Sequence, residues 1–452
     1  MTQPPSLEEL TALQDELRQL LQHPKPEQRL GKLPQAERLR LQQQLAQQRL
    51  IKDKLPSWQL VLAYIPSSLA LEQCSSQQAA EYKQRFVRRE DRLLDMTGGL
   101  GVDFSALTAA AHSGVYVEQQ PQLVAAARYN LPRLLPDRPI TIYEGRSTEL
   151  LDELLERHQP TLIYLDPARR EQGDRQRRVY ALEDCEPDLL GLLPRIREHY
   201  SALGLPLPRL LVKVSPMLDL KHTLRSVPET KELHVVAVQS EVKELLLSID
   251  LAAPSPSSYQ DVPLVVSLLL GGGQEQSLRF ERAFAEEEAL IARYATELGR
   301  WLYLPHAALM KAGLYKSLAA RYALEPLHVS SHLYTSDEAC PDFPGRRYEV
   351  DEVLPFSSSL LRRLAKEHLA AQIICRNFPL SADELRRRLK AAEHDTCALL
   401  GTTLSTGEAV LIRCRQPVML PPFLLLGFVL PFFFFSFFLS FFLSFSFFLS
   451  FF

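Results

Sequence analysis

The sequence is poor in the residue patterns that build metal centres and disulfide frameworks. Its six cysteines stand far apart, with no C-x-x-C pair and no cluster of cysteine with histidine, so we expect neither a metal site nor structural disulfides. An excess of one charge is also missing, because the formal net charge is −3 at pH 7 over 452 residues. Any affinity for nucleic acid must therefore come from local basic patches.

A targeting segment is not apparent at the N-terminus. The first residues, MTQPPSLEELTALQDEL, are polar and acidic and do not predict a signal peptide. A composition of 46% hydrophobic and 23% charged residues is typical of a globular protein. We expect a cytoplasmic protein, and a chain of this length predicts two or three domains.

Phenylalanine is sparse until the C-terminal tail, residues 418–452, where residues 431–452 contain only Pro, Phe, Leu and Ser. One interpretation is a membrane anchor at 423–452, since 30 helical residues span roughly 45 Å, with residues 1–417 outside the membrane. The other is translated repeat DNA, natural and phase-variable or a sequence artefact, because Phe-Leu-Ser-Phe at 438–441 recurs at 442–445 and all four residue types have pyrimidine-only codons. We favour the second interpretation.

The middle of the chain, residues 81–272, predicts a Rossmann-like α/β domain. Short apolar runs alternate with amphipathic stretches there, and strands that are apolar throughout and separated by helices form parallel sheets covered on both faces. The last two runs, 234–238 and 244–250, are separated by only five residues. That gap is too short for a helical crossover and predicts an antiparallel pair.

The flanking regions predict other units. Residues 1–80 carry leucines at helical spacing and predict an N-terminal helical subdomain. Residues 252–277, rich in Pro, Ser and Gly, are expected to join the two halves. From residue 279 to 417 amphipathic helices, expected at 281–299, 358–371 and 381–392, mix with short strands, which predicts an α+β unit.

A glycine-rich segment, DMTGGLGVD, follows the first apolar run and opens a helix. Glycines allow the backbone close to a ligand, and a helix N-terminus favours an anionic group. Glu118 ends the second run, where a carboxylate can accept hydrogen bonds from two ribose hydroxyls. A dinucleotide site would need a third glycine where Phe104 stands. We therefore expect S-adenosyl-L-methionine as the cofactor, bound by Asp95, Thr97, Gly98, Gly99, Gly101, Asp103 and Glu118, with Arg146 and Ser147 beside its adenine.

A second motif, LDPARR (165–170), follows the fourth run, at the sheet edge where open α/β sheets bind ligands. It resembles motif IV of nucleic-acid amino-methyltransferases, in which an acid or amide and a proline carbonyl orient a target amine. We expect Asp166, Pro167 and Arg169 to act here, although Ala168 and Arg169 replace the usual proline and aromatic. A structural alternative for Asp166 is the capping of a helix. The 5-methylpyrimidine enzymes share an Asp-Pro-x-Arg motif but need a cysteine nucleophile, and the corresponding segment, 213–216, has none.

A basic run follows this motif: residues 169–178, RREQGDRQRR, contain five arginines and two acidic residues. Such runs are often solvated surface, but this one lies beside the expected active site. It is the expected RNA-phosphate contact, made by Arg170, Arg175, Arg177 and Arg178.

Taken together, these motifs resemble a bacterial family of class I S-adenosylmethionine-dependent methyltransferases with ferredoxin-like and THUMP-like C-terminal domains. Specific strings that carry the resemblance are DMTGGLGVDF, YLDPARR, KVSPMLD, LPHAALMKAG and RNFPLSADELRRRLK. The resemblance implies a ferredoxin-like segment at 279–326, a THUMP-like domain at 327–417 and a structured RNA, tRNA or rRNA, as the partner. Two other hypotheses stay open: methylation of a small molecule or protein, and an RNA-binding scaffold without catalytic activity.

Overall fold

The computed structural model describes residues 3–169, 182–394 and 396–416, which divide into two compact units. The first comprises residues up to 290 together with 306–317, and the second comprises 291–305 and the described residues from 318 onward. The first unit is an α/β fold and the second combines helices with a separate sheet, which confirms the predicted fold class. The predicted tail at 418–452 lies outside the described residues.

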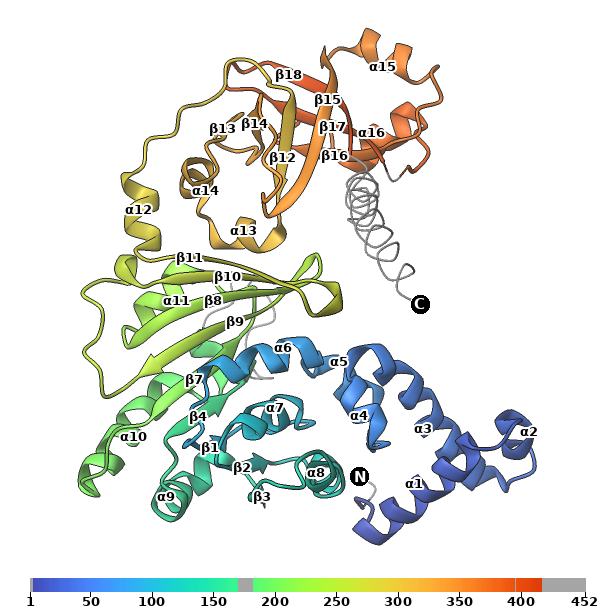
Figure 1. Ribbon diagram of the computed structural model, residues 1–452, viewed down its shortest axis with the longest axis vertical. Coiled ribbons are helices and arrows are strands. Elements are labelled where there is room, and N and C mark those ends of the chain that lie inside the picture. The colour runs from blue at the N-terminus through green and yellow to red at the C-terminus, as the bar shows by residue number, and fades with distance from the viewer. Residues whose placement is uncertain (1–2, 170–181, 395, 417–452) are drawn as a thin grey trace, which may run out of the picture. The chain divides into compact units, whose positions relative to one another are not determined.

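Within the described residues, the first unit is built on a nine-stranded sheet in the order β11-β10-β8-β9-β7-β4-β1-β2-β3 (Figure 1). Its strands are β1 (Arg92–Asp95), β2 (Ser113–Glu118), β3 (Ile140–Glu144), β4 (Leu162–Leu165), β7 (Arg209–Val214), β8 (Thr230–Val238), β9 (Glu241–Asp250), β10 (Leu264–Leu269) and β11 (Glu275–Phe280). The first five are mutually parallel, and β9 lies antiparallel between β7 and β8. The antiparallel pair predicted from the short 239–243 connection is therefore confirmed.

Helices connect the parallel strands, as the alternating pattern predicts. They are α7 (Val102–Ala110), α8 (Pro121–Leu134), α9 (Ser147–His158), α10 (Leu189–Ala202) and α11 (Leu220–Ser226), with α12 (Ala283–Ala289) and α13 (Ala307–Ala312) further along the chain. Phe104 and Leu107 of α7 pack with Leu131 of α8 against Tyr116 and Tyr164 of the sheet. Two short strands, β5 (Ala168–Arg169) and β6 (Cys185–Glu186), pair with each other beyond the end of β4.

The helices that precede β1 in the chain belong to the first unit. They are α1 (Leu7–Leu21), α2 (Pro26–Leu30), α3 (Gln35–Lys54), α4 (Pro56–Leu60), α5 (Ser68–Gln73) and α6 (Gln77–Tyr82), followed by the 3-10 turn η1 (Lys83–Phe86). Helix α1 begins with a capping box, in which the Ser6 side chain and Glu9 exchange hydrogen bonds with each other's backbone N–H. Its buried Leu10 packs against Tyr129 of α8. No described helix has both the length and the apolar character needed to cross a bilayer.

The expected join at 252–277 is wrong, because part of it belongs to the first sheet. Strand β10 has all six residues buried and pairs parallel to β8, and β11 pairs antiparallel to β10. The run LVVSLL is apolar enough to form a buried strand, but the Pro, Ser and Gly residues around it obscured that pattern.

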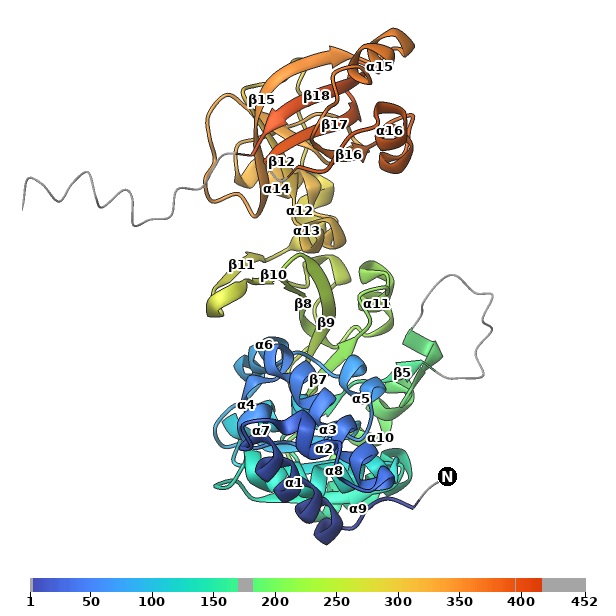
Figure 2. The same cartoon turned by 90° about the vertical axis from the view of Figure 1, so that its right-hand side faces the viewer.

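The second unit contains, among its described residues, a seven-stranded sheet in the order β13-β14-β12-β15-β18-β17-β16. Its strands are β12 (Trp301–Pro305), β13 (Glu325–Pro326), β14 (Tyr334–Ser336), β15 (Gly345–Pro355), β16 (Gln372–Arg376), β17 (Cys397–Thr403) and β18 (Ala409–Arg415). Its helices include α15 (Ser358–Leu364) and α16 (Ala382–Leu389), and α14 (Tyr315–Arg321) begins in the first unit and ends in the second. Figure 2 shows α15 and α16 along one face of this sheet, where Leu364 and Leu389 pack on Leu399 and Leu411.

One predicted helix of this half is wrong over most of its length. A helix was expected at 281–299, but α12 ends at Ala289. Beyond it, Ala295 is buried in the core of the second unit and its N–H donates to the carbonyl of Pro326. The helical spacing of these apolar residues is overridden because the segment packs as extended chain against the second sheet.

Candidate functional site

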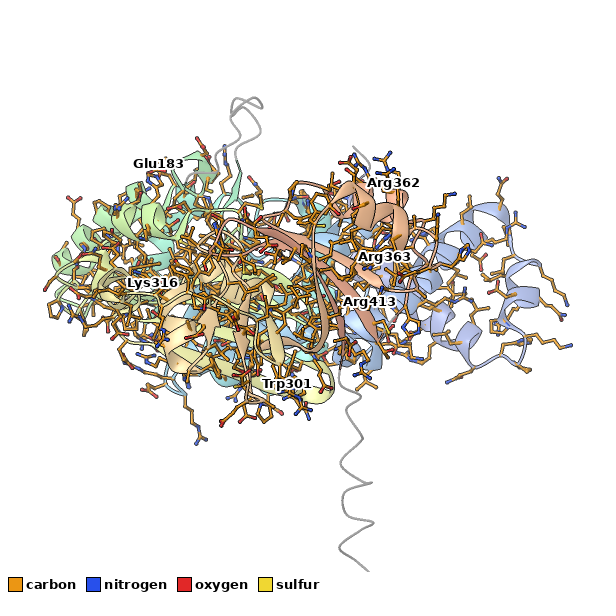
Figure 3. The ribbon with its side chains drawn as sticks, turned by 90° about the horizontal axis from the view of Figure 1, so that it is seen from above. Glu183, Trp301, Lys316, Arg362, Arg363 and Arg413 are labelled. Carbon is orange, nitrogen blue, oxygen red and sulfur yellow. The ribbon has the colours of Figure 1, made fainter. Side chains whose placement is uncertain are left out.

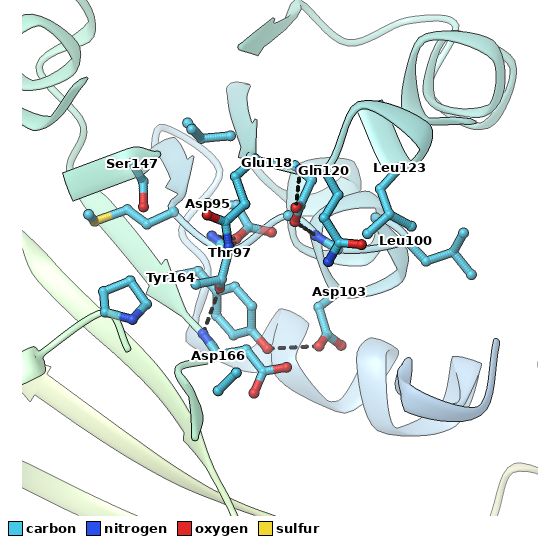
Figure 4. Close-up of a pocket in the computed structure, with 18 of the residues that line it drawn as sticks. Asp95, Thr97, Leu100, Asp103, Glu118, Gln120, Leu123, Ser147, Tyr164 and Asp166 are labelled. Carbon is cyan, nitrogen blue, oxygen red and sulfur yellow. Dashed lines mark hydrogen bonds between the residues drawn. The ribbon is translucent and has the colours of Figure 1, made fainter. Parts of the chain in front are cut away.

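A pocket opens at the carboxyl ends of β1, β2 and β4, where parallel strands of an open sheet place their ligands (Figure 4). Its wall comes from the glycine-rich segment, the end of β2, the β3–α9 connection, the end of β4 and the segment 70–75. The predicted residues that it brings together are Asp95, Thr97, Gly98, Gly99, Gly101, Asp103, Glu118, Arg146, Ser147 and Asp166.

Other predicted residues do not line this pocket or fall outside the description. Pro167 is buried and does not line the pocket. The backbone of Arg169 belongs to β5. The predicted RNA contacts Arg170, Arg175, Arg177 and Arg178 lie outside the described residues.

The glycine-rich segment passes closely over the sheet. A Cβ on Gly98 would stand 2.3 Å from the Tyr116 ring, so a side chain there is excluded. Gly101 has φ +91°, in the left-handed region that favours glycine. The Tyr116 hydroxyl donates to the carbonyl of Gly99 and fixes the loop from below. At its glycines the loop therefore presents backbone to the pocket.

Glu118 is buried at the end of β2 and organises this loop. One of its oxygens accepts the N–H of Gly99 at 2.9 Å, and the other accepts the N–H of Gln120 at 2.8 Å. Each carboxylate oxygen has a second lone-pair direction. Two hydroxyls of a ligand can thus be accepted side by side, which fits the diol of a ribose.

Asp95, at the end of β1, is almost fully buried beneath the pocket. Its Oδ1 accepts the N–H of Thr97 at 2.9 Å. Burial raises the pKa of Asp95 well above its ordinary value, despite this hydrogen bond from the Thr97 backbone. A cationic group of a ligand would offset the burial of the charged carboxylate.

Asp166 stands where β4 ends, directly beside the glycine-rich segment. Its backbone N–H donates to Thr97 Oγ1 at 2.7 Å, and its side chain remains 37% exposed toward the pocket. The alternative role of Asp166 as a helix cap is wrong, because the chain after it continues into strand β5. Instead, its Oδ2 lies 2.5 Å from the ammonium nitrogen of Lys213 on β7.

Asp103 is held in a buried group of charges below the pocket. Its Oδ1 accepts from Lys83 at 3.0 Å, and its Oδ2 accepts from the Tyr164 hydroxyl at 2.7 Å. Burial raises the pKa of Asp103, but Lys83 and Lys213 outweigh burial and hold the pKa below its ordinary value. Both oxygens are engaged within the protein, so Asp103 supports the pocket wall more than it offers a free acceptor.

Arg146 and Ser147 border the other end of the pocket, at the start of α9. Arg146 lies 3.5 Å from Glu186 and 3.9 Å from Glu149, and all three side chains are largely exposed. Ser147 is buried at the first position of the helix.

Among the polar residues in or below the pocket that were not predicted are Lys213, Lys83 and Ser75. Lys213 stands inside the otherwise apolar run LLVKV, and this was a usable signal, because a buried lysine needs a partner. Ser75 lies in the predicted helical subdomain, and Lys83 lies in the predicted α/β domain, before its first strand. Nothing in their local pattern indicates a contact with Asp103.

A cysteine, Cys74, lines the pocket from the α5–α6 connection. It does not come from the 213–216 segment, which corresponds to the segment that carries the nucleophile in the 5-methylpyrimidine enzymes. Its thiol donates to the carbonyl of Leu71, and burial raises its pKa. The neutral thiol is therefore favoured over the thiolate that covalent catalysis needs.

Comparisons with known proteins agree with this architecture. One family model, described as a ferredoxin-like domain, matches residues 301–344, and another, described as THUMP domain-like, matches 345–416. An uncharacterized S-adenosylmethionine-dependent methyltransferase of Mycobacterium tuberculosis is 28% identical over 345 residues, which cover 75% of this chain and 84% of the relative. The crystal structure of a "putative methyltransferase" from Porphyromonas gingivalis W83 is 37% identical, with 92% of this chain and 100% of that chain covered at a TM-score of 0.81.

Proposed function

Since this chain belongs to the family of S-adenosylmethionine-dependent methyltransferases with C-terminal ferredoxin-like and THUMP-like domains, we propose that it methylates a base of a structured RNA, a tRNA or an rRNA. The enzyme class and the cofactor expected from the sequence are confirmed by the family. The RNA substrate, the reacting atom and the role of each pocket residue are the proposal.

In this proposal the glycine-rich segment and Glu118 hold the cofactor. Glu118 accepts both ribose hydroxyls, using the lone pairs that its two backbone partners leave open. The backbone of Gly98 and Gly99 lies against the methionine part, where a side chain would collide. Arg146 and Ser147 border the adenine. When bound, S-adenosylmethionine supplies an electrophilic methyl group on a positively charged sulfur.

The placement of Asp166 is the observation that carries the proposed chemistry. Its backbone is tied to Thr97 of the cofactor segment, and its carboxylate is exposed to the same pocket. A target amine that donates a hydrogen bond to Asp166 would therefore lie next to the cofactor. Such an arrangement contributes proximity and orientation more than acid–base catalysis.

The transfer is balanced by these groups. With S-adenosylmethionine bound, the lone pair of the amine would form the new N–C bond, and the cofactor would keep the electron pair of the S–C bond that is broken. The Asp166 carboxylate would stabilise the positive charge that the amine nitrogen gains. Asp166 then accepts the proton that the methylated amine loses and passes it to solvent, to which more than a third of its side chain is exposed.

Support for an RNA substrate comes from the THUMP-like part, residues 345–416. Figure 3 shows Arg362, Arg363 and Arg413 at one end of the second unit. Exposed basic residues that make no ion pair within the described part of the chain lie on or just after α15 and α16 and at the end of β16: Arg362, Lys366, Arg376, Arg387 and Lys390. Unpaired surface cations are suited to phosphate contacts.

The test is nucleoside mass spectrometry on RNA methylated by the purified protein. RNA from a strain that lacks the gene should gain one methylated nucleoside, whereas RNA from the parent strain, already modified, should gain little. If neither RNA accepts methyl groups but the protein or metabolite fraction does, the RNA substrate is wrong. Cofactor binding without transfer to any fraction would instead indicate an RNA-binding scaffold.

A further inference from the structure

We propose that Lys213 is a positioning residue for methyl transfer: it holds the Asp166 carboxylate toward the pocket. Lys213 is itself held by a buried charge network that includes Asp103, Lys83 and Glu244. The inference rests on the proposed role of Asp166. It adds a residue from β7 and a segment before the sheet to a site otherwise built from the β1, β2 and β4 ends.

The sheet register brings the two side chains together. Strands β4 and β7 are parallel neighbours, with Leu165 paired to Val212. The next positions along the two strands are Asp166 and Lys213, whose side chains point to the same face. Their ion pair at 2.5 Å follows from this register, so the position of Asp166 is coupled to the sheet and not only to the loop that follows it.

Lys213 has no donor left for a substrate. Its ammonium nitrogen has three acceptors around it, namely Asp166 Oδ2 at 2.5 Å, Asp103 Oδ2 at 3.4 Å and Ser75 Oγ at 3.3 Å. An ammonium group carries three N–H donors. Its side chain is only 12% exposed, and Lys213 therefore acts on the target through Asp166.

The network continues away from the pocket and fixes Lys213. Asp103 is shared between Lys213 and Lys83, and Lys83, whose side chain is fully buried, also lies 2.7 Å from Glu244 on β9. Negative and positive groups alternate from Asp166 to Glu244. Burial lowers the pKa of Lys213, but the Asp166 and Asp103 carboxylates outweigh it and raise the pKa above its ordinary value. Lys213 therefore stays protonated while Asp166 orients the target amine.

Such a network is not needed to stabilise the fold. Buried ion pairs are often no more stabilising than apolar residues of the same volume. Here the network ends at a partly exposed carboxylate in a ligand pocket, and three carboxylates share two ammonium groups. Both features suit a site that must orient an amine and stabilise a positive charge.

The experiment compares Lys213→Met, which keeps the length but removes the charge, with Lys213→Arg, which keeps the charge. Lys243→Met is the matched control, because Lys243 lies on the neighbouring strand β9 in an exposed ion pair with Glu241. Methyl transfer to RNA from the gene-deleted strain is measured per folded molecule. We expect kcat to fall roughly 100-fold in Lys213→Met with little change in KM for RNA, as for a misplaced catalytic group. Lys213→Arg should recover part of kcat, and Lys243→Met should match the unmodified protein.

An unchanged kcat in folded Lys213→Met would overturn the inference. Equal losses in the Met and Arg variants, accompanied by equal losses of thermal stability, would reduce Lys213 to a structural role and overturn it as well.

A second readout needs no RNA and separates this inference from the proposed function. Calorimetry gives the affinities for S-adenosylmethionine and for its demethylated product, whose sulfur is neutral. Lys213→Met removes a positive charge beside the pocket and should shift the preference toward the cationic cofactor by roughly three- to tenfold, while Lys213→Arg should not. If the unmodified protein transfers nothing to RNA, the RNA proposal fails and this ratio alone decides the role of Lys213. An unchanged ratio then overturns it.

Discussion

The first sheet of this protein has a buried charge network below its pocket as well as exposed ion pairs, whereas the second sheet has ion pairs at its surface. In the first unit, Lys83, Asp103 and Glu244 pair below the pocket with side chains at most 10% exposed. In the second unit, pairs such as Arg300–Glu349 and Arg415–Asp351 lie at the surface, where one partner of each is more than 60% exposed. Charges interact strongly where water is excluded and weakly where it is not. Changes in the pocket should therefore alter chemistry and cofactor affinity steeply, and changes on the second sheet should have graded, salt-dependent effects.

The sharpest test of the pocket is Gly98→Ala. The added Cβ would meet the Tyr116 ring at 2.3 Å, so the cofactor segment must move. If this displacement costs roughly 3 kcal/mol of binding free energy, cofactor affinity should fall about 100-fold. Calorimetry with S-adenosylmethionine measures this loss. Gly271→Ala, where the Cβ would have nothing within 4 Å, is the control and should bind normally. Normal binding by Gly98→Ala would show that the loop tolerates displacement.

Glu118→Ala should have the next largest effect. It removes the proposed acceptor of two ribose hydroxyls, and a charge-assisted hydrogen bond contributes about 1.5–3 kcal/mol. We expect a loss in cofactor affinity of roughly 10- to 150-fold. Glu144→Ala is matched to it, because Glu144 ends the neighbouring strand β3 but lies outside the pocket. If the two variants bind S-adenosylmethionine with equal affinity, Glu118 does not contact the cofactor.

On the second sheet, the double variant Arg362→Glu, Arg387→Glu tests the exposed cations. RNA binding should weaken several-fold at low salt, and the slope of log affinity against log salt should flatten by about one to two units. Filter binding at several salt concentrations gives both values, and cofactor affinity should not change. Arg40→Glu together with Arg29→Glu makes the same change of charge in the N-terminal helices. If that pair weakens RNA binding as much, the effect reflects net charge and not a surface of the THUMP-like part.

The smallest expected effect is a pH dependence from Asp95. Burial raises the pKa of Asp95, so the native protein without cofactor binds a proton more tightly than the unfolded chain does. Its stability should therefore fall as pH rises from the ordinary pKa of Asp through the raised one. Asp95→Asn keeps the acceptor for the Thr97 N–H and removes the titration, so its stability relative to the parent should grow as the pH rises above the ordinary pKa of Asp. Chemical unfolding at each pH, with Asp137→Asn as an exposed control, measures the difference; a constant difference would contradict the assignment.

The sequence predicted those parts of the site that lie on one strand end or one turn. The glycine-rich segment, Glu118 and Asp166 each follow an apolar run, and parallel strands bring such ends to one edge. Lys213 and Lys83 were missed because their partners are set by strand register and by packing of residues 70–86 against the sheet. The same reason explains the errors at 252–277 and 281–299, where tertiary packing decided between strand, helix and extended chain.

The most direct measurement concerns Asp166, with Asp166→Ala and Asp166→Asn assayed on the same samples for cofactor affinity, thermal unfolding and methyl transfer to RNA. If Asp166 orients the target amine, the Ala variant should bind cofactor nearly normally and lose turnover, because the interaction matters mainly on the way to the transition state. The Asn variant keeps an oxygen acceptor and should retain more activity than the Ala variant. Full turnover by a folded Asp166→Ala protein would contradict the account.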